Sequence, residues 1–189
     1  TIASDENGPV EKAQVWLAIF SSACLFFAAT RLRVGRTVLT VCACMVGYAA
    51  ARECDTWFET VLFDDAYKYL AGIPLIGIAM NAVYRGRKEL FHETMTLART
   101  PTITLFAFAG IYICGVCQVM ERPDFWAAVS GEGAIKTRAA IEEFAELFGY
   151  LVIAFSGVES VAMALAACES PVTVEQPTQQ LAAPALCTK

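Results

Sequence analysis

The stretch TPTITLFAFAGIYICGVCQVM, residues 100–120, decides the fold class, because it holds no Asp, Glu, Lys or Arg over 21 residues. A helix needs about 20 apolar residues to cross the hydrocarbon core of a bilayer. Further uncharged runs lie at residues 13–30, 37–51 and 69–84, and residues 147–168 form another that only Glu159 interrupts. We therefore expect an all-α, polytopic membrane helix bundle with about five transmembrane helices.

Composition supports the same class. Of the 189 residues, 57% are hydrophobic and 17% are charged, whereas a typical soluble domain has about 25% charged residues. The runs 37–51 and 69–84 are short for a span and would need flanking residues such as Arg36 and Arg52 to reach the interfaces. A soluble helical bundle is the alternative, but five such runs would leave it little polar surface. The net charge of −5 also argues against a nucleic-acid partner.

The loop charges predict the orientation. Residues 31–36 contain three arginines and no acid, and residues 85–99 contain more basic than acidic residues. These two loops should be cytoplasmic by the positive-inside rule. The tail 1–12 and the loops 52–68 and 121–146 contain more acid than base, so we expect them outside. The expected protein is N-out and C-in, with a five-span membrane domain at 13–168 and a flexible C-terminal tail at 169–189.

Acidic residues gather in the expected outer segments. If the helix of residues 37–51 continued through Trp57, Asp55 and Glu59 would share a face at i,i+4 spacing. Residues 135–152 are expected to extend the last helix outward and to add three further acids. The candidate outer acidic cluster comprises Arg52, Glu53, Asp55, Glu59, Asp64, Asp65, Glu142, Glu143 and Glu146.

Several interpretations of this cluster stay open. It can be a solvated anionic surface with salt bridges, which are individually weak, or a docking surface for a partner. It can be a carboxylate site for a divalent cation such as Ca²⁺ or Mg²⁺. It can also be a catalytic carboxylate cluster, metal-assisted or not, that acts on a lipid or an exported substrate.

A second candidate set is polar and lies within the spans. Glu159 is well inside the run 147–168, where an ionisable group costs roughly 2.5–3.5 kcal/mol unless it is paired or hydrated. Asn81 and Gln118 are its candidate partners, and Ser156 and Ser160 form a small-xxx-small face suited to close helix contact. The set could relay a proton or a cation. Alternatively, Glu159 is protonated within an interhelical hydrogen bond.

The remaining motifs leave the cofactor unknown and match no haem or zinc pattern. His92 is the only histidine, so bis-histidine haem ligation is excluded, and Glu89 with His92 forms only one of the two Glu-x-x-His pairs of a di-iron bundle. Cys114 and Cys117 form a CGVC motif within an uncharged run, without a second pair at zinc spacing. We therefore expect structural cysteines and no haem or zinc site. A divalent cation on the outer acidic face stays open.

Three segments together carry a resemblance: NGPVEK at residues 7–12, RECD at residues 52–55 and IEEFAELFGYL at residues 141–151. With its RExD and EExxEL patterns, the chain resembles a group of small uncharacterised bacterial multi-pass inner-membrane proteins. The resemblance implies the bacterial inner (cytoplasmic) membrane as the location and an outer Arg/Glu/Asp/Glu set as a shared feature, but no activity. Thr56 and Trp57 follow Asp55 where the group has an aromatic residue and then a histidine, which weakens a metal site.

The absence of any complete catalytic set favours a non-enzymatic function. We expect a subunit or accessory factor of a membrane assembly, acting through helix packing and the acidic outer face. Its partners would be the lipid bilayer and other membrane subunits or further copies of itself. The alternative is a carboxylate-dependent membrane hydrolase or a protein that handles cations or protons.

Overall fold

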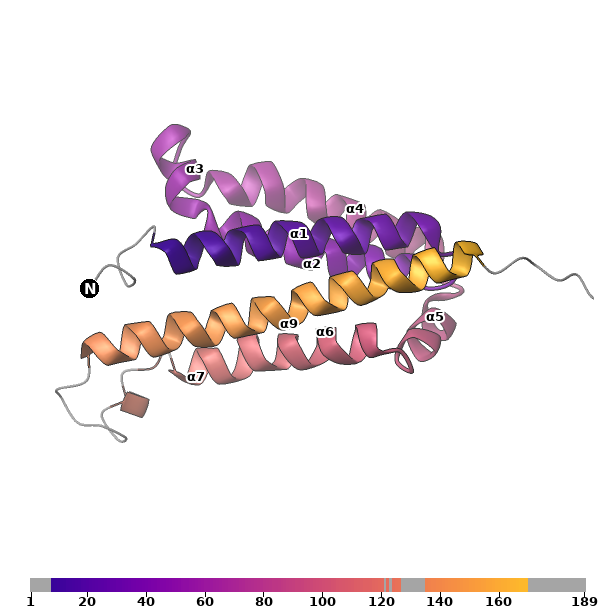
Figure 1. Ribbon diagram of the computed structural model, residues 1–189. Helices are drawn as coiled ribbons and strands as arrows, with labels where there is room; N and C mark the ends of the chain where they lie inside the picture. The colour runs from indigo at the N-terminus through magenta and orange to yellow at the C-terminus, as the bar shows by residue number, and fades with distance from the viewer. Residues whose placement is uncertain (1–7, 121, 123, 127–134, 170–189) are drawn as a thin grey trace, which may run out of the picture.

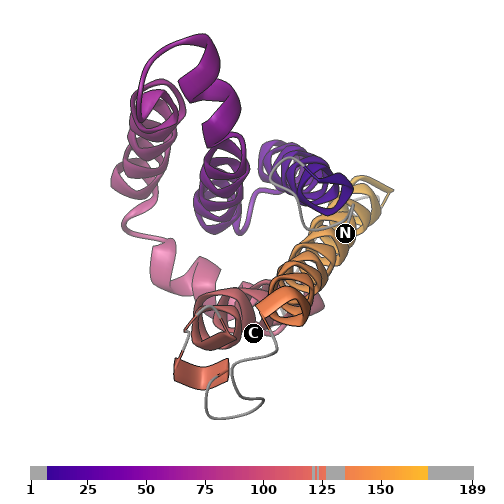
Figure 2. The ribbon, with the colours of Figure 1, turned by 90° about the vertical axis from the view of Figure 1, so that its left-hand side faces the viewer.

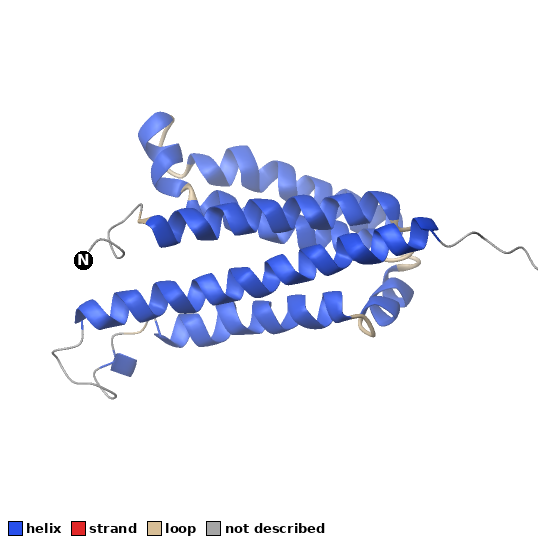
Figure 3. Ribbon diagram, in the orientation of Figure 1, coloured by secondary structure: helices blue, strands red, loops and turns tan. Residues whose placement is uncertain are grey.

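The computed structural model describes residues 8–120, 122, 124–126 and 135–169, and the regular structure within these ranges is helical, without a strand (Figure 3). The expected C-terminal tail therefore lies almost wholly outside the described residues, as do residues 1–7 and part of the loop 121–146. The elements are α1 (Pro9–Arg31), α2 (Arg36–Glu53), α3 (Asp55–Val61), η1 (Lys68–Gly72), α4 (Ile73–Gly86), α5 (Leu90–Leu97), α6 (Pro101–Ile111), η2 (Tyr112–Cys117), α7 (Gln118–Met120) and α9 (Ile135–Glu169).

The all-helical class is confirmed. Among the described residues, three helices are long and apolar enough to cross a membrane: Pro9–Arg31, Pro101–Met120 and Ala140–Cys168. A fourth qualifies if α2 and α3 together form one bent span. The run 69–84 is divided between the π-helical turn η1 and α4. Pro74 explains the division, because proline has no N–H group to donate to the carbonyl four residues earlier. The fifth span stays a prediction.

The second helix does not continue through Trp57. It ends at Glu53, and α3 leaves Cys54 at an angle of 60° to it. Asp55 and Glu59 do share a helix, but that helix is α3, which turns away from the bundle (Figure 1). The expected extension of the last helix is confirmed, because α9 is continuous over 35 residues. At about 1.5 Å per residue it is longer than the roughly 30 Å hydrocarbon core.

The long helices form one curved layer. Their contacts follow the order α4, α2, α1, α9, α6, with α1 in the middle. Figure 2, which looks along the bundle, shows α4 and α6 at the two ends of this layer, with α5 linking them along the chain. Because each end helix has a long helix on one side only, none of the residues of α4 is buried.

Small residues allow α1 to pack closely on both of its neighbours. A Cβ on Gly157 of α9 would lie 3.2 Å from Cβ of Cys24 and 3.3 Å from Cα of Ser21. On the other side, the hydroxyl of Ser22 donates to the carbonyl of Ala43 in α2 at 2.9 Å. Short side chains and interhelical hydrogen bonds of this kind are what holds helices together in lipid.

The corner between α2, α4 and α5 is built on two glycines and one carboxylate. Gly35 caps α2 with φ of +92° and lies against Leu97, which leaves no room for a side chain. Gly86 at the end of α4 lies so close to Thr37 that an added Cβ would be 2.1 Å from its Oγ1. Gly35 has no side chain that could cap α2. The buried side chain of Glu93 in α5 caps this helix instead, and its Oε2 accepts a hydrogen bond from the N–H of Thr37 at 3.0 Å.

Candidate functional site

The outer acidic residues fall into separate groups. The first is centred on Glu53, the last residue of α2, whose side chain is 13% exposed. Its Oε1 accepts a hydrogen bond from the hydroxyl of Tyr150 in α9 at 3.1 Å and lies 3.7 Å from Nη2 of Arg52. This bond links α2 to α9 although α1 lies between them in the layer, so Glu53 connects these two helices at the end of the bundle where α2 ends.

Tyr150 was not among the expected site residues. It is 4% exposed, and it lies one helical turn beyond Glu146 on α9. The i,i+4 spacing from Glu146 placed it on the acidic face of that helix, and this was the only signal in the sequence. A tyrosine that is buried in a span needs a partner for its hydroxyl, and Glu53 provides it.

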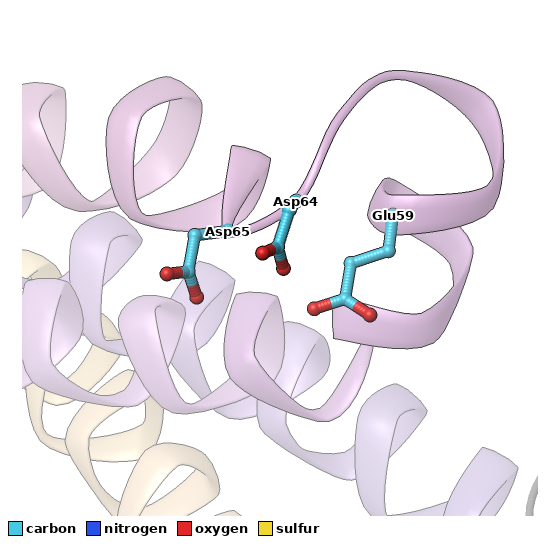
Figure 4. A group of neighbouring side chains, drawn as sticks. All are labelled: Glu59, Asp64 and Asp65. Carbon is cyan, nitrogen blue, oxygen red and sulfur yellow. The ribbon is translucent and has the colours of Figure 1, made fainter.

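The second group consists of Glu59, Asp64 and Asp65, and one carboxylate oxygen from each lies within 4.8 Å of the others. Figure 4 shows these three side chains converging from α3 and from the turn that follows it. Glu59 and Asp64 are exposed, and Asp65 has a positive φ of 60°. Carboxylates at this spacing can hold a hard divalent cation if water supplies the other ligands.

Lys68 already neutralises part of this group. Its Nζ lies 2.6 Å from Oδ1 of Asp65, and both side chains are about half exposed. The pKa of Lys68 is raised, mainly by the hydrogen bond with Asp65 and then by the negative charge of that residue. Any cation bound by the three carboxylates would therefore have to compete with the ammonium group.

The acids of α9 are placed by the packing of that helix on α1. The side-chain amide of Gln14 in α1 donates to the backbone carbonyl of Glu143 at 3.0 Å. Glu142, Glu143 and Glu146 are all half-buried. They lie on a different helix from the carboxylates of Glu59, Asp64 and Asp65, and no fourth His, Cys, Asp or Glu among the described residues joins that group. The expected single cluster is thus distributed over α2, α3 with its turn, and α9.

The polar residues within the spans do not come together. Asn81 is exposed on α4, which packs against α2. Gln118 follows η2, and η2 packs against α9 at Gly149, where an added Cβ would be 2.4 Å from Ile113. Glu159 is ten residues further along α9, or about 15 Å along its axis. It is half-buried, and neither of the ion pairs found among the described residues includes it.

Ser156 and Ser160 do form the expected close-contact face. Both are fully buried, and the hydroxyl of Ser156 donates to the carbonyl of Thr102 in α6 at 2.8 Å. His92 is exposed on α5, and Glu89, which precedes that helix, is exposed as well. Cys114 and Cys117 are free thiols, the first exposed and the second buried. Among the described residues, neither His92 nor the CGVC motif belongs to a group of His, Cys, Asp and Glu side chains spaced to hold a metal ion.

The described residues define an all-helical fold in which three or four helices are long and apolar enough to cross a membrane and acidic groups lie at one end of the bundle. Comparison of the chain with known protein families, with curated proteins and with solved structures found no match.

Proposed function

We propose that this protein is a small integral protein of the bacterial inner membrane that acts as a subunit or accessory factor of a membrane assembly. In this proposal it has five spans, with the N-terminus outside and the C-terminus inside. Its partner is a transmembrane helix of another subunit or of a second copy, packed against an end helix of the curved layer.

Glycines on the two end helices of the layer support the proposal. A Cβ added to Gly77 of α4 or to Gly110 of α6 would meet no atom within 4 Å. Leu75 of α4 lies against α2. Gly77 comes two residues later, which is about 200° around the axis of α4, so it lies on the side of α4 away from that contact. Glycine weakens a helix by roughly 0.5–1 kcal/mol relative to alanine. A close-packed partner helix gives these positions a physical role, because small residues let helix backbones approach each other in lipid.

The assembly can be tested by purification in mild detergent from the native membrane. The wild-type protein should migrate as a complex, either with other subunits or with itself. Gly77→Leu and Gly110→Leu should reduce the recovered complex while leaving the monomer folded. Ala23→Leu, at an exposed position of the central helix α1, is the matched control and should have no effect. A wild-type protein that is a monodisperse lone monomer would contradict the proposal.

The topology is tested separately by reporter fusions. Alkaline phosphatase is active only outside the cytoplasm, so it should be active when fused after residue 63 and inactive when fused after residue 89. Green fluorescent protein should show the opposite pattern at these sites. Identical patterns at the two positions would exclude a span between them.

A second candidate function is suggested by the convergence of Glu59, Asp64 and Asp65. If these carboxylates serve a metal-assisted hydrolase or a cation-handling protein, Ca²⁺ or Mg²⁺ should raise the melting temperature of the purified protein. Asp64→Asn should abolish that increase, whereas Glu89→Gln, at an exposed acid of the opposite loop, should not. If no divalent ion co-purifies and chelation leaves stability unchanged, the metal-based version fails.

A further inference from the structure

A cavity lies at the opposite end of the bundle from the acidic groups. It has a volume of about 550 Å³ and is bounded by the start of α2, the end of α4 and the beginning of α5. This volume falls within the roughly 300–1,000 Å³ that is usual for small-molecule sites. The basic side chains in its wall are Arg33, Arg36, Arg85 and Lys88.

The acids in the wall do not balance these bases. Only Glu89 and Glu93 line the cavity beside the four basic residues. The carboxylate of Glu93 is already engaged, since it accepts from the N–H groups of Thr37 and Val38 at 3.0 and 3.4 Å. Glu89 is exposed at the helix start. The cavity therefore has an excess of positive charge that the protein itself does not neutralise.

The basic side chains are available to a ligand. All four are exposed although they border the cavity, and within the described ranges none of them forms an ion pair. Like charges that converge without a counter-charge repel each other, so an anion in the cavity would lower the energy of this arrangement. The planar guanidinium of arginine matches the oxygens of a phosphate group and can bond to it through two N–H groups.

The cavity is also amphipathic along α4. Arg85 lies at its charged end, Asn81 one turn earlier, and Ile78 seven residues earlier, which is about 10 Å along the helix. The wall thus passes from basic to apolar in the direction that leads into the expected bilayer. Basic pockets between helices at the cytoplasmic interface are suited to the headgroups of anionic lipids.

We propose that this cavity binds a phosphate-bearing ligand, with Arg36 and Arg85 holding the phosphate. The phosphate can belong to the headgroup of an anionic phospholipid, whose first chain carbons would lie against Ile78, or to a soluble phosphate ester. This inference does not depend on the proposed role in a membrane assembly, because binding is measured on the isolated protein.

The test compares two double variants of equal charge. Arg36→Gln/Arg85→Gln removes the two arginines from the cavity wall. Arg31→Gln/Arg87→Gln is the matched control, because these arginines belong to the same basic loops but lie over the rings of Phe27 and Tyr84 and do not line the cavity. A third variant, Arg36→Lys/Arg85→Lys, keeps the charge and should retain part of the binding. Far-UV circular dichroism and the melting temperature verify that each variant is folded.

Two arms identify the source of the phosphate. In the first arm, phosphatidylglycerol is titrated into the detergent-solubilised protein, and the lipid-bound fraction is measured by native mass spectrometry. Phosphatidylcholine, a zwitterion without net charge, is the comparison. In the second arm, glycerol 3-phosphate and inorganic phosphate are titrated by calorimetry. The expected result is saturable binding in one arm that the cavity variant weakens about tenfold or more, because charge-assisted hydrogen bonds are lost, and that the control variant changes less than about twofold.

The outcome of each arm decides between the alternatives. Binding of phosphatidylglycerol alone identifies a lipid site, and binding of the soluble compounds identifies a site for a phosphate ester. The proposal is overturned if neither arm shows saturable binding, if both double variants weaken it equally, or if phosphatidylcholine binds as tightly as phosphatidylglycerol.

Discussion

Replacing Glu93 by alanine should loosen the corner where α5 holds the start of α2. Glu93 is 4% exposed, and its carboxylate accepts from the N–H groups of Thr37 and Val38. These are the second and third residues of α2, whose N–H groups have no partner within the helix. Gly35 precedes the helix and has no side chain to replace the carboxylate.

The magnitude follows from these two hydrogen bonds. A hydrogen bond to a charged group contributes about 1.5–3 kcal/mol, and the loss of a helix cap costs about 0.5–2 kcal/mol. The bond to Val38 is long at 3.4 Å, so we count mainly the bond to Thr37 at 3.0 Å. Glu93→Ala should lower the free energy of unfolding by about 2–4 kcal/mol, and Glu93→Gln, which keeps one acceptor oxygen, by about 1–2 kcal/mol.

The assay is equilibrium unfolding in mixed micelles, combined with hydrogen–deuterium exchange. Glu89→Ala is the control, since Glu89 is exposed four residues earlier and should change stability by less than about 0.5 kcal/mol. Exchange at the amides of Thr37 and Val38 should accelerate in Glu93→Ala and stay unchanged in the control. The reasoning is refuted if Glu93→Ala is no more destabilising than Glu89→Ala, or if these two amides exchange as slowly as in the wild type.

Further substitutions test the other helix contacts by the same unfolding assay. Gly86→Ala should destabilise by about 1–3 kcal/mol, because its Cβ would overlap a side chain of α2, whereas Gly77→Ala, which meets nothing, should be neutral or stabilising. Tyr150→Phe should cost about 1–2 kcal/mol, because it leaves the carboxylate of Glu53 without its hydroxyl donor; an equal loss in a Glu53→Ala background, which has no acceptor for this hydroxyl, would disprove this coupling. Ser156→Ala should cost only about 0.6 kcal/mol, as is usual for interhelical hydrogen bonds in membranes, and a loss above 2 kcal/mol would show that the residue does more than bond to Thr102.

Much of the candidate site could not be predicted from the sequence. The spacing of Asp55 and Glu59 suggested one acidic face, but the break at Cys54 turns α3 by 60° and separates Glu59 from Glu53. Asn81 was a candidate partner for Glu159 because both are polar residues within expected spans, yet α4 and α9 pack on different helices. The basic loops predicted orientation only, and their convergence on one cavity required the close approach of Gly86 to Thr37.

The sequence by itself determined the helical class and the approximate position of the long apolar helices. Both depend on local properties, since an uncharged run of sufficient length must bond its own backbone in lipid, and only a helix does so within one segment. The tertiary structure alone decided which polar groups meet. Whether Glu53 reaches Tyr150, or Glu93 caps α2, depends on the order and rotation of the helices. Those are set by contacts between glycines, serines and alanines far apart in the chain, and no local pattern of hydropathy records them.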